Sequence, residues 1–252
     1  MRGILSAAYG AVCYVIFFAT FLYAIGFVEG VVVPKSIDSG TPGALIPSLI
    51  IDAALLSLFA VQHSLMARPF FKRWWTRVVA PPVERSTYVL FASLALAVLF
   101  AEWRPLTQTI WSIAPGPLAT ALTVLSFAGF GVVLISTFLI SHFELFGLTQ
   151  VYDRLRGRQA EAMEFRTPGF YKMVRHPIYA GFIIAFWATP TMSLGHLIFA
   201  LATTAYIVVA IQFEEHDLIG MFGERYRAYR QQVGMLLPKL GRPRVTTPVE
   251  PT

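Results

Sequence analysis

Two short groups of polar residues flank a long uncharged stretch of the chain. Arg175, His176 and Pro177 stand at its start, and Glu214 and Glu215 follow its end. No Asp, Glu, Lys or Arg occurs in the 37 residues that begin with Pro177. A proline suits the first turn of a helix, whose free N–H groups, with Arg175 beside them, suit a carboxylate or a phosphate. One glutamate can hold an amine or a pair of ribose hydroxyls, while the other pairs with Arg175 or with the arginines that follow.

The uncharged stretch is long enough to fold back on itself inside a membrane. The turn sequence Ser193-Leu194-Gly195-His196 divides it into two arms of about 19 residues. Each arm spans about 28 Å as a helix, which predicts a hairpin that returns the glutamates to the His-Pro pair at one membrane surface. The plainer alternative is that Arg175 and Tyr179 are interfacial anchors and that the glutamates form a solvated helix end.

The composition indicates an integral membrane protein. Hydrophobic residues make up 56% of the chain and charged residues 13%, against roughly 25% charged in a soluble domain. We expect an all-α membrane protein with five to six transmembrane helices, of which the third is short and the last two form the hairpin. Whether both arms of the hairpin cross the membrane fully stays open from the sequence. The whole is expected to form one domain at 1–240 with a disordered tail at 241–252. The expected spans are 4–28, 43–67, 86–101, 117–141, 177–194 and 196–213.

The basic residues predict the orientation. With these spans, 18 of the 20 Lys and Arg fall on one side, and only Lys35 and Arg104 fall on the other. The positive-inside rule then places both termini and both polar groups in the cytoplasm. The net charge of +6 is explained by loops beside anionic lipid, so no nucleic-acid partner is expected. The single Cys13 excludes an intrachain disulfide and a thiol cluster, and we expect no metal.

A basic amphipathic helix is predicted after the hairpin. Within residues 222–230, Tyr226 and Arg230 stand at i and i+4, so they share a face. This helix either lies on the membrane surface or places Tyr226 or Tyr229 over a bound purine, and spacing does not separate these roles.

The hairpin region resembles the isoprenylcysteine carboxyl methyltransferase-like superfamily. The resemblance covers about 163–238 and rests on Gly169-x-Tyr171-x-x-x-Arg175-His176-Pro177-x-Tyr179-x-Gly181, Glu214-Glu215 and Phe222-Gly223-x-x-Tyr226-x-x-Tyr229. It implies that the hairpin and the following helix bind S-adenosylmethionine from the cytosol, while the other spans form the acceptor site. Phe165-Arg166-Thr167 stands where the prenylcysteine enzymes have Leu-Val-Thr. The implied cofactor residues are Phe165, Arg166, Thr167, Tyr171, Arg175, His176, Pro177, Tyr179, Glu214, Glu215, Tyr226 and Tyr229.

Motifs along nearly the whole chain resemble the bacterial NnrU-type branch of this superfamily. This resemblance implies a multi-pass enzyme of the bacterial inner membrane that methylates methanethiol with S-adenosylmethionine, giving dimethyl sulfide and S-adenosylhomocysteine. The oligomeric state stays open. The motifs lie at 33–38, 62–64, 66–69, 84–88, 136–143 and 186–192.

Three residues are candidates for the acceptor chemistry that a small thiol requires. Asp52 and His63 lie within about 20° of one face of the second span, but about 16 Å apart along it, so they do not form an acid–base pair. His63 is the first candidate for the proton acceptor, and the alternative is an interfacial histidine bonded to a neighbouring helix. Asp52 is better suited to a structural or gating role than to catalysis. His142 is a second candidate base.

Other functions remain open from the sequence. A membrane methyltransferase with a larger lipid or prenylcysteine acceptor would need a wider pocket, which the bulky Phe138, Phe146, Phe186 and Trp187 disfavour. A non-enzymatic NnrU-type membrane protein and a nicotinamide-dependent reductase are further alternatives, since Arg-His-Pro-x-Tyr also resembles membrane sterol reductases.

Overall fold

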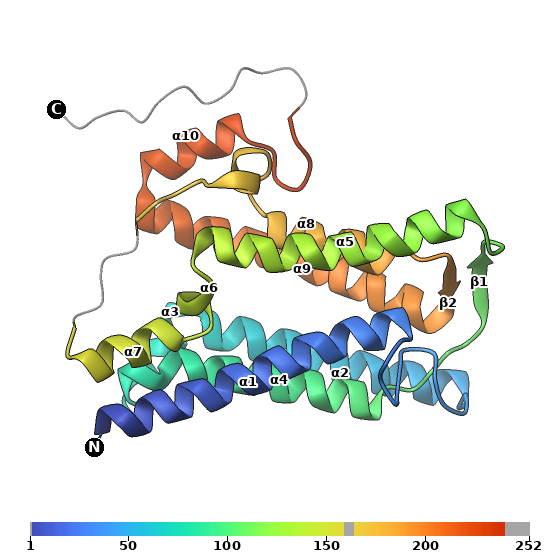
Figure 1. Ribbon diagram of the computed structural model, residues 1–252, viewed down its shortest axis with the longest axis horizontal. Coiled ribbons are helices and arrows are strands. Elements are labelled where there is room, and N and C mark those ends of the chain that lie inside the picture. Colours follow the sequence, from blue (N-terminus) through green and yellow to red (C-terminus); the bar gives the residue numbers. More distant parts are fainter. Residues whose placement is uncertain (1, 159–163, 240–252) are drawn as a thin grey trace.

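The chain folds into a bundle of long helices that run along the longest axis of the molecule (Figure 1). The structure is a computed structural model that describes residues 2–158 and 164–239. The tail 241–252, expected to be disordered, lies outside the described residues, as does residue 163. The helices are α1 (Arg2–Glu29), α2 (Leu45–Ala67), α3 (Pro69–Trp75), α4 (Pro81–Glu102), α5 (Pro117–Ile140), α6 (His142–Leu145), α7 (Leu148–Arg156), α8 (Pro177–Trp187), α9 (Leu194–Phe222) and α10 (Glu224–Gln232), with a 3-10 turn at Gly169–Lys172.

Five of these helices, α1, α2, α4, α5 and α9, are long and apolar enough to cross a membrane, and α8 is a shorter apolar helix. This confirms the predicted all-α membrane fold. The third span is longer than the expected 86–101, because α4 begins at Pro81, where two prolines suit a first turn and Glu84 lies near the positive end of the helix. The expected span was too short because it was drawn to begin after Arg85, the nearest charged residue, whereas the helix itself includes Glu84 and Arg85.

The first arm of the hairpin is shorter than predicted. The expected span 177–194 ends at Trp187, because Pro190 cannot donate a helical hydrogen bond and restricts the residue before it. Eleven residues span only about 16 Å. The chain then continues in β2 (Thr191–Ser193), which pairs antiparallel with β1 (Thr109–Ser112). The all-α prediction missed this small sheet.

The second arm is longer than the predicted 196–213. α9 contains 29 residues and begins after Ser193, whose hydroxyl accepts a hydrogen bond from the His196 N–H at 3.0 Å. It spans about 43 Å and continues past Glu214 and Glu215 to Gly223, which breaks the helix with a φ of +56°. The two glutamates therefore lie within the helix, on different faces of it.

α8 packs tightly against α5 through two glycines. A Cβ on Gly129 would lie 2.6 Å from the Gly181 carbonyl oxygen and from the Ala185 nitrogen. The Ser126 hydroxyl also donates to the Ala185 carbonyl at 2.6 Å. Small residues allow membrane helices to approach this closely, and the contact fixes the start of α8 in space.

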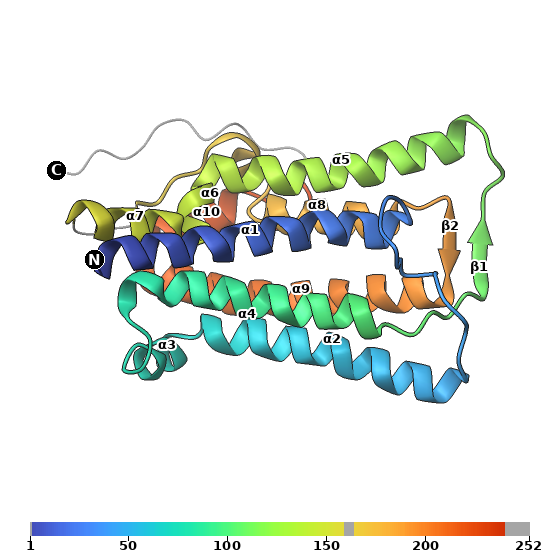
Figure 2. The ribbon, with the colours of Figure 1, turned by 60° about the horizontal axis from the view of Figure 1, so that its bottom comes forward.

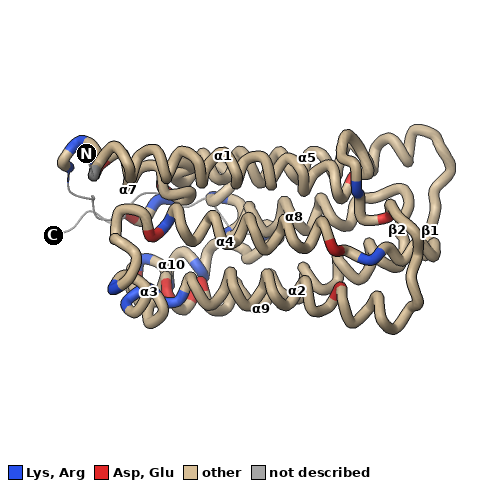
Figure 3. Tube along the Cα trace, turned by 90° about the horizontal axis from the view of Figure 1, so that it is seen from below, with Lys and Arg blue, Asp and Glu red and all other residues tan. Residues whose placement is uncertain are grey.

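The two ends of the bundle differ in charge. One end carries α3, α6, α7, α10 and the N-terminus, and the other carries β1 and β2 (Figure 2). Most of the Lys and Arg residues gather at the first end (Figure 3), which we call the basic end. Towards the sheet end, an aromatic core formed by Phe27, Phe100, Trp103, Phe186 and Phe199 holds the long helices together.

Candidate functional site

The start of α8 is the first component of the polar site at the basic end. The helix begins at Pro177 with His176 in the capping position, as predicted. The backbone N–H groups of Arg175 and His176 donate to the carbonyls of Gly234 and Met235, at 2.8 and 3.1 Å. The segment after α10 thereby lies against the entrance of α8. The N–H groups within the first turn still lack helical partners, as at every helix start.

Glu215 lies at the centre of a buried ionic network. Its Oε1 atom accepts from Arg175 Nε at 2.6 Å and lies 3.2 Å from His176 Nε2, and its Oε2 atom is 3.1 Å from Arg230 Nε. The side chains of Arg175 and Glu215 are only 8% and 4% exposed. Arg175 also donates to the carbonyls of Arg230 and Val233. The network joins α8, α9 and α10, so it confirms that the hairpin returns the glutamates to the His-Pro pair.

Glu214 is the accessible member of the acidic pair. Its side chain is 42% exposed, its Oε2 atom accepts from the Tyr179 hydroxyl at 2.7 Å, and its Oε1 atom lies 3.7 Å from His176 Nδ1. The sequence left open which glutamate faces a ligand. The structure places Glu215 in the protein interior and leaves Glu214 with carboxylate oxygen available to a ligand.

Two tyrosines, Tyr88 on α4 and Tyr206 on α9, contact the part of α2 that carries His63. The Tyr88 hydroxyl lies 2.9 and 3.1 Å from the two ring nitrogens of His63, and the Tyr206 hydroxyl lies 3.1 Å from the Ser64 hydroxyl. Ser64 neighbours His63 on α2, and Tyr206 lies on α9, the second arm of the hairpin. The structure therefore brings the region of His63, from α2, to the hairpin.

Tyr88 and Tyr206 were not among the predicted site residues. The sequence does contain a signal for them, because each is a tyrosine within a largely apolar membrane helix. Polar side chains in such helices usually have a polar partner or a function. The guanidinium of Arg85 lies 5.0 Å from the Tyr88 ring centroid, and Arg68 forms a 3.1 Å ion pair with Asp217 that joins α2 to α9 at the same end.

The predicted aromatic residues pack against one another beside the ionic network. Phe165 contacts the rings of Tyr226 and Tyr229 with centroids 5.9 and 5.4 Å apart, and the Tyr229 hydroxyl donates to the Tyr171 carbonyl at 2.6 Å. Burial raises the pKa of Tyr171, Tyr226 and Tyr229, so all three stay protonated. The buried Tyr226 hydroxyl has no hydrogen-bond partner among the described residues.

Two further predicted residues lie at the edge of this aromatic group. Arg166 pairs with Glu164 at the surface, at 2.7 Å, and Thr167 is half-buried. Both stand on the segment that leads from Glu164 to the 3-10 turn before α8.

Asp52 and His142 lie apart from the Glu214 site. Asp52 is buried towards the sheet end of α2, where its Oδ1 atom accepts from the Arg104 backbone N–H at 2.8 Å. Both ring nitrogens of His142 have hydroxyl partners, Tyr14 at 2.8 Å and Thr137 at 2.7 Å. These contacts suit structural roles, as the sequence already favoured for Asp52.

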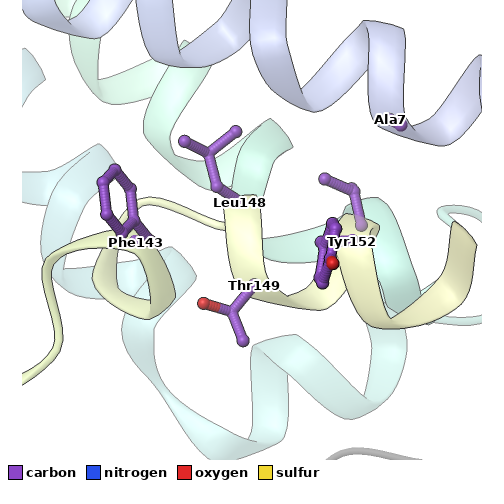
Figure 4. A pocket seen from close by; sticks show the side chains of 6 residues that line it. Ala7, Phe143, Leu148, Thr149 and Tyr152 are labelled. Atoms are coloured by element: carbon purple, nitrogen blue, oxygen red, sulfur yellow. The ribbon is translucent and has the colours of Figure 1, made fainter. Parts of the chain in front are cut away.

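Two cavities open outside the polar site. One, of about 370 Å³, lies between α1, α6 and α7 (Figure 4), and a second, of about 230 Å³, lies at the sheet end beside His196 and Asp38. No residue predicted to bind the cofactor lines either of them. Within 2–158 and 164–239, no group of three His, Cys, Asp or Glu side chains is arranged to hold a metal ion.

The fold and the polar site define a multi-pass α-helical membrane protein with a C-terminal hairpin closed by buried ion pairs. The chain is 57% identical over 230 residues to methanethiol S-methyltransferase 1 of Bradyrhizobium diazoefficiens, which covers 91% of this chain and 81% of that protein. It therefore belongs to the methanethiol S-methyltransferase family, an enzyme family, which confirms the resemblance seen in its motifs.

Other members of the family match over similar lengths. The methanethiol S-methyltransferase of Mycobacterium tuberculosis is 50% identical over 238 residues, 94% of this chain and 98% of that protein. The enzyme of Crocosphaera subtropica is 49% identical over 234 residues, 93% and 92% of the two chains. No family model and no solved structure matches the chain.

Proposed function

We propose that this protein transfers a methyl group from S-adenosylmethionine to methanethiol, forming dimethyl sulfide and S-adenosylhomocysteine. The main support for the proposal is one observation in a chain of this family. The accessible Glu214 is paired with Tyr179, next to the buried network of Glu215. We also propose that 1–240 forms one membrane domain, in which the described part of 163–238 holds the cofactor.

The residues at the basic end fit a sulfonium nucleoside. Glu214 supplies carboxylate oxygen for an amine or for ribose hydroxyls, and the half-exposed Arg230 supplies positive charge for a carboxylate. The buried Tyr226 hydroxyl, which lacks a partner among the described residues, offers one donor and one acceptor beside them. When bound, S-adenosylmethionine supplies an already activated methyl group, so the protein has to position the thiol and exclude water.

His63 is the proposed proton acceptor for the thiol. The hydroxyl of Tyr88 lies near both ring nitrogens of His63. A neutral imidazole carries one N–H group and one free nitrogen. In the tautomer whose N–H donates to the Tyr88 oxygen, the other nitrogen is free to accept the thiol proton, while Tyr88 holds the ring in place. The thiolate sulfur then bonds to the methyl carbon in line with the departing sulfonium sulfur, and the proton stays on His63.

The charge distribution supports a cytoplasmic location for this site. Lys and Arg gather at the basic end (Figure 3), and by the positive-inside rule this end faces the cytoplasm, with both termini. We propose that the protein resides in a bacterial inner membrane, where the cofactor is supplied from the cytosol and the apolar thiol from either phase.

The proposal is tested with purified protein in detergent or nanodiscs. Formation of S-adenosylhomocysteine should depend on both S-adenosylmethionine and methanethiol, and should fall steeply when a prenylated cysteine replaces the small thiol. Equal turnover of the prenylated acceptor would assign the protein to the larger-acceptor class, and no turnover of either would refute the enzyme assignment.

A further inference from the structure

An apolar groove lies at the basic end between α1 and α7, outside the polar site (Figure 4). Its volume of about 370 Å³ falls in the range of ligand pockets, which are mostly apolar with a few polar groups. Here the polar groups are the hydroxyls of Thr149 and Tyr152. The lining residues are Ala7, Phe143, Leu148, Thr149, Val151 and Tyr152.

The walls of the groove are fixed by close packing of the two helices. A Cβ on Gly10 would lie 2.7 Å from Val151 Cγ2, and a Cβ on Gly3 would lie 3.3 Å from the Leu155 Cα. α7 therefore lies directly on α1 on both sides of Ala7. The groove therefore lies between two points at which α1 and α7 are packed closely together.

Positive charge lies at the rim of the groove. The guanidinium carbon of Arg156 is 5.5 Å from the ring centroid of Tyr152, which lines the groove. Arg156 is exposed, and no carboxylate among the described residues lies within ion-pair distance of it. Among residues 2–158 and 164–239, the charge of Arg156 at the rim therefore has no carboxylate partner.

The groove lies at the level where lipid headgroups meet acyl chains. The first membrane span begins at Gly3, and the apolar side chains of Ile4 and Leu5 are 65% and 69% exposed. Ala7 is about 6 Å further into the span. α7 is amphipathic, with Arg154 and Arg156 in its last turn, as is typical of helices at the membrane interface.

We propose that this groove binds one anionic phospholipid of the adjacent leaflet. One acyl chain lies between Ala7 and Tyr152, and the phosphate lies against Arg156. Basic pockets at the cytoplasmic side of membrane helices bind acidic headgroups in this way. A neutral lipid fills the groove but supplies no counter-charge to Arg156. The site is separate from the proposed methyl-transfer site, because none of the proposed catalytic or cofactor residues lines the groove.

Native mass spectrometry of the full-length protein tests the proposal. The protein is titrated with phosphatidylglycerol and with phosphatidylcholine of the same acyl chains. We expect retention of phosphatidylglycerol at clearly lower lipid concentration. Arg156→Gln should weaken phosphatidylglycerol retention about fivefold and leave phosphatidylcholine unchanged, since one arginine near the surface contributes about that factor.

Two matched controls separate the groove from general effects. Ala7→Leu fills the groove and should weaken retention of both lipids, whereas Ala8→Leu adds the same volume at an exposed neighbour about 100° around the helix and should change neither. Arg225→Gln removes an exposed charge from α10 and should also leave retention unchanged.

Several outcomes would overturn the proposal. Equal retention of the two lipids by the wild type, or equal effects of Ala7→Leu and Ala8→Leu, would exclude an anionic-lipid groove. Displacement of phosphatidylglycerol by inorganic phosphate would indicate a soluble anion, and a dimer lost only in Ala7→Leu would indicate a second copy of the chain. If Ala7→Leu does not fold, unchanged phosphatidylglycerol retention by Arg156→Gln refutes the proposal by itself.

Discussion

The Nε atom of Arg175 lies 2.6 Å from the Oε1 atom of Glu215, although 40 residues separate the two in the chain. Both side chains are buried, and His176 and Arg230 contact the same carboxylate. This contact closes the hairpin at the basic end. It also fixes the rotation of α9, and thereby turns Glu214 to its accessible position.

Replacing Glu215 by Gln should destabilise the protein. The change leaves Arg175 and Arg230 without their shared counter-charge, and breaking a buried pair in this way costs about 3–5 kcal/mol. Unfolding by denaturant measures the effect, with Glu164→Gln at an exposed pair as the control that leaves the midpoint unchanged. A normal midpoint for Glu215→Gln would show that the network does not hold the hairpin.

Replacing Glu214 by Gln should weaken cofactor binding without loss of stability. The side chain is 42% exposed, so the fold tolerates the change. Loss of a charged hydrogen-bond acceptor costs about 1.5–3 kcal/mol, or at least about tenfold in affinity. Calorimetric titration with S-adenosylhomocysteine measures it, and Tyr179→Phe should give a smaller loss because its hydroxyl only orients Glu214. Unaltered affinity in Glu214→Gln would remove Glu214 from the site.

Replacing His63 by Ala should lower turnover about 10²- to 10⁴-fold and leave S-adenosylhomocysteine affinity unchanged, because general-base catalysis contributes that factor. Turnover and affinity are measured separately on the same preparation. His216→Ala, at an exposed position of α9, serves as the control and should change neither. A parallel loss of turnover and affinity in His63→Ala would assign this histidine to structure.

Replacing Gly129 by Ala should disrupt the contact between α5 and α8. The added Cβ would lie 2.6 Å from backbone atoms of α8, which cannot move aside as a side chain can. Overpacking of this kind costs about 1–3 kcal/mol. Gly131→Ala on the same helix meets no atom within 4 Å and is the matched control in a thermal unfolding experiment. Equal unfolding temperatures would contradict the close approach of the two helices.

The pH dependence of stability should include a contribution from His142. Burial lowers its pKa below the ordinary value of 6.5. The unfolded chain therefore binds more protons than the folded protein, so stability is lost as the pH falls through 6.5 towards the lower folded pKa. Between about pH 7.5 and about pH 5.5, the unfolding midpoint of the wild type should fall further than that of His142→Gln. Equal falls would contradict this contribution.

The sequence predicted the features that depend on long apolar runs and on charge. The membrane fold, the start of α8 at Pro177 and the return of the hairpin are confirmed, since hydrophobic length and a proline in the first turn determine them locally. The predicted length of the first arm, 177–194, was wrong, because it was taken from the length of the uncharged run. The helix ends at Trp187, before Pro190.

The division of roles within the site depends on tertiary packing and was not predictable. Glu214 and Glu215 are neighbours in the chain, and only the rotation of α9 decides which one meets Arg175. Tyr88 lies on α4 and Tyr206 on α9, and no spacing rule connects either tyrosine with Glu214 or predicts their contacts with α2. The three-residue strand β2 is too short to show an alternating pattern.

Methyl transfer itself is tested most directly by following the label from donor to product. The purified protein is given methanethiol and S-adenosylmethionine with a deuterated methyl group, and the headspace is analysed by mass spectrometry. We expect dimethyl sulfide that carries one fully deuterated methyl group, in an amount that His63→Ala strongly reduces. Dimethyl sulfide without the label, or none at all from protein that binds the cofactor, would contradict it.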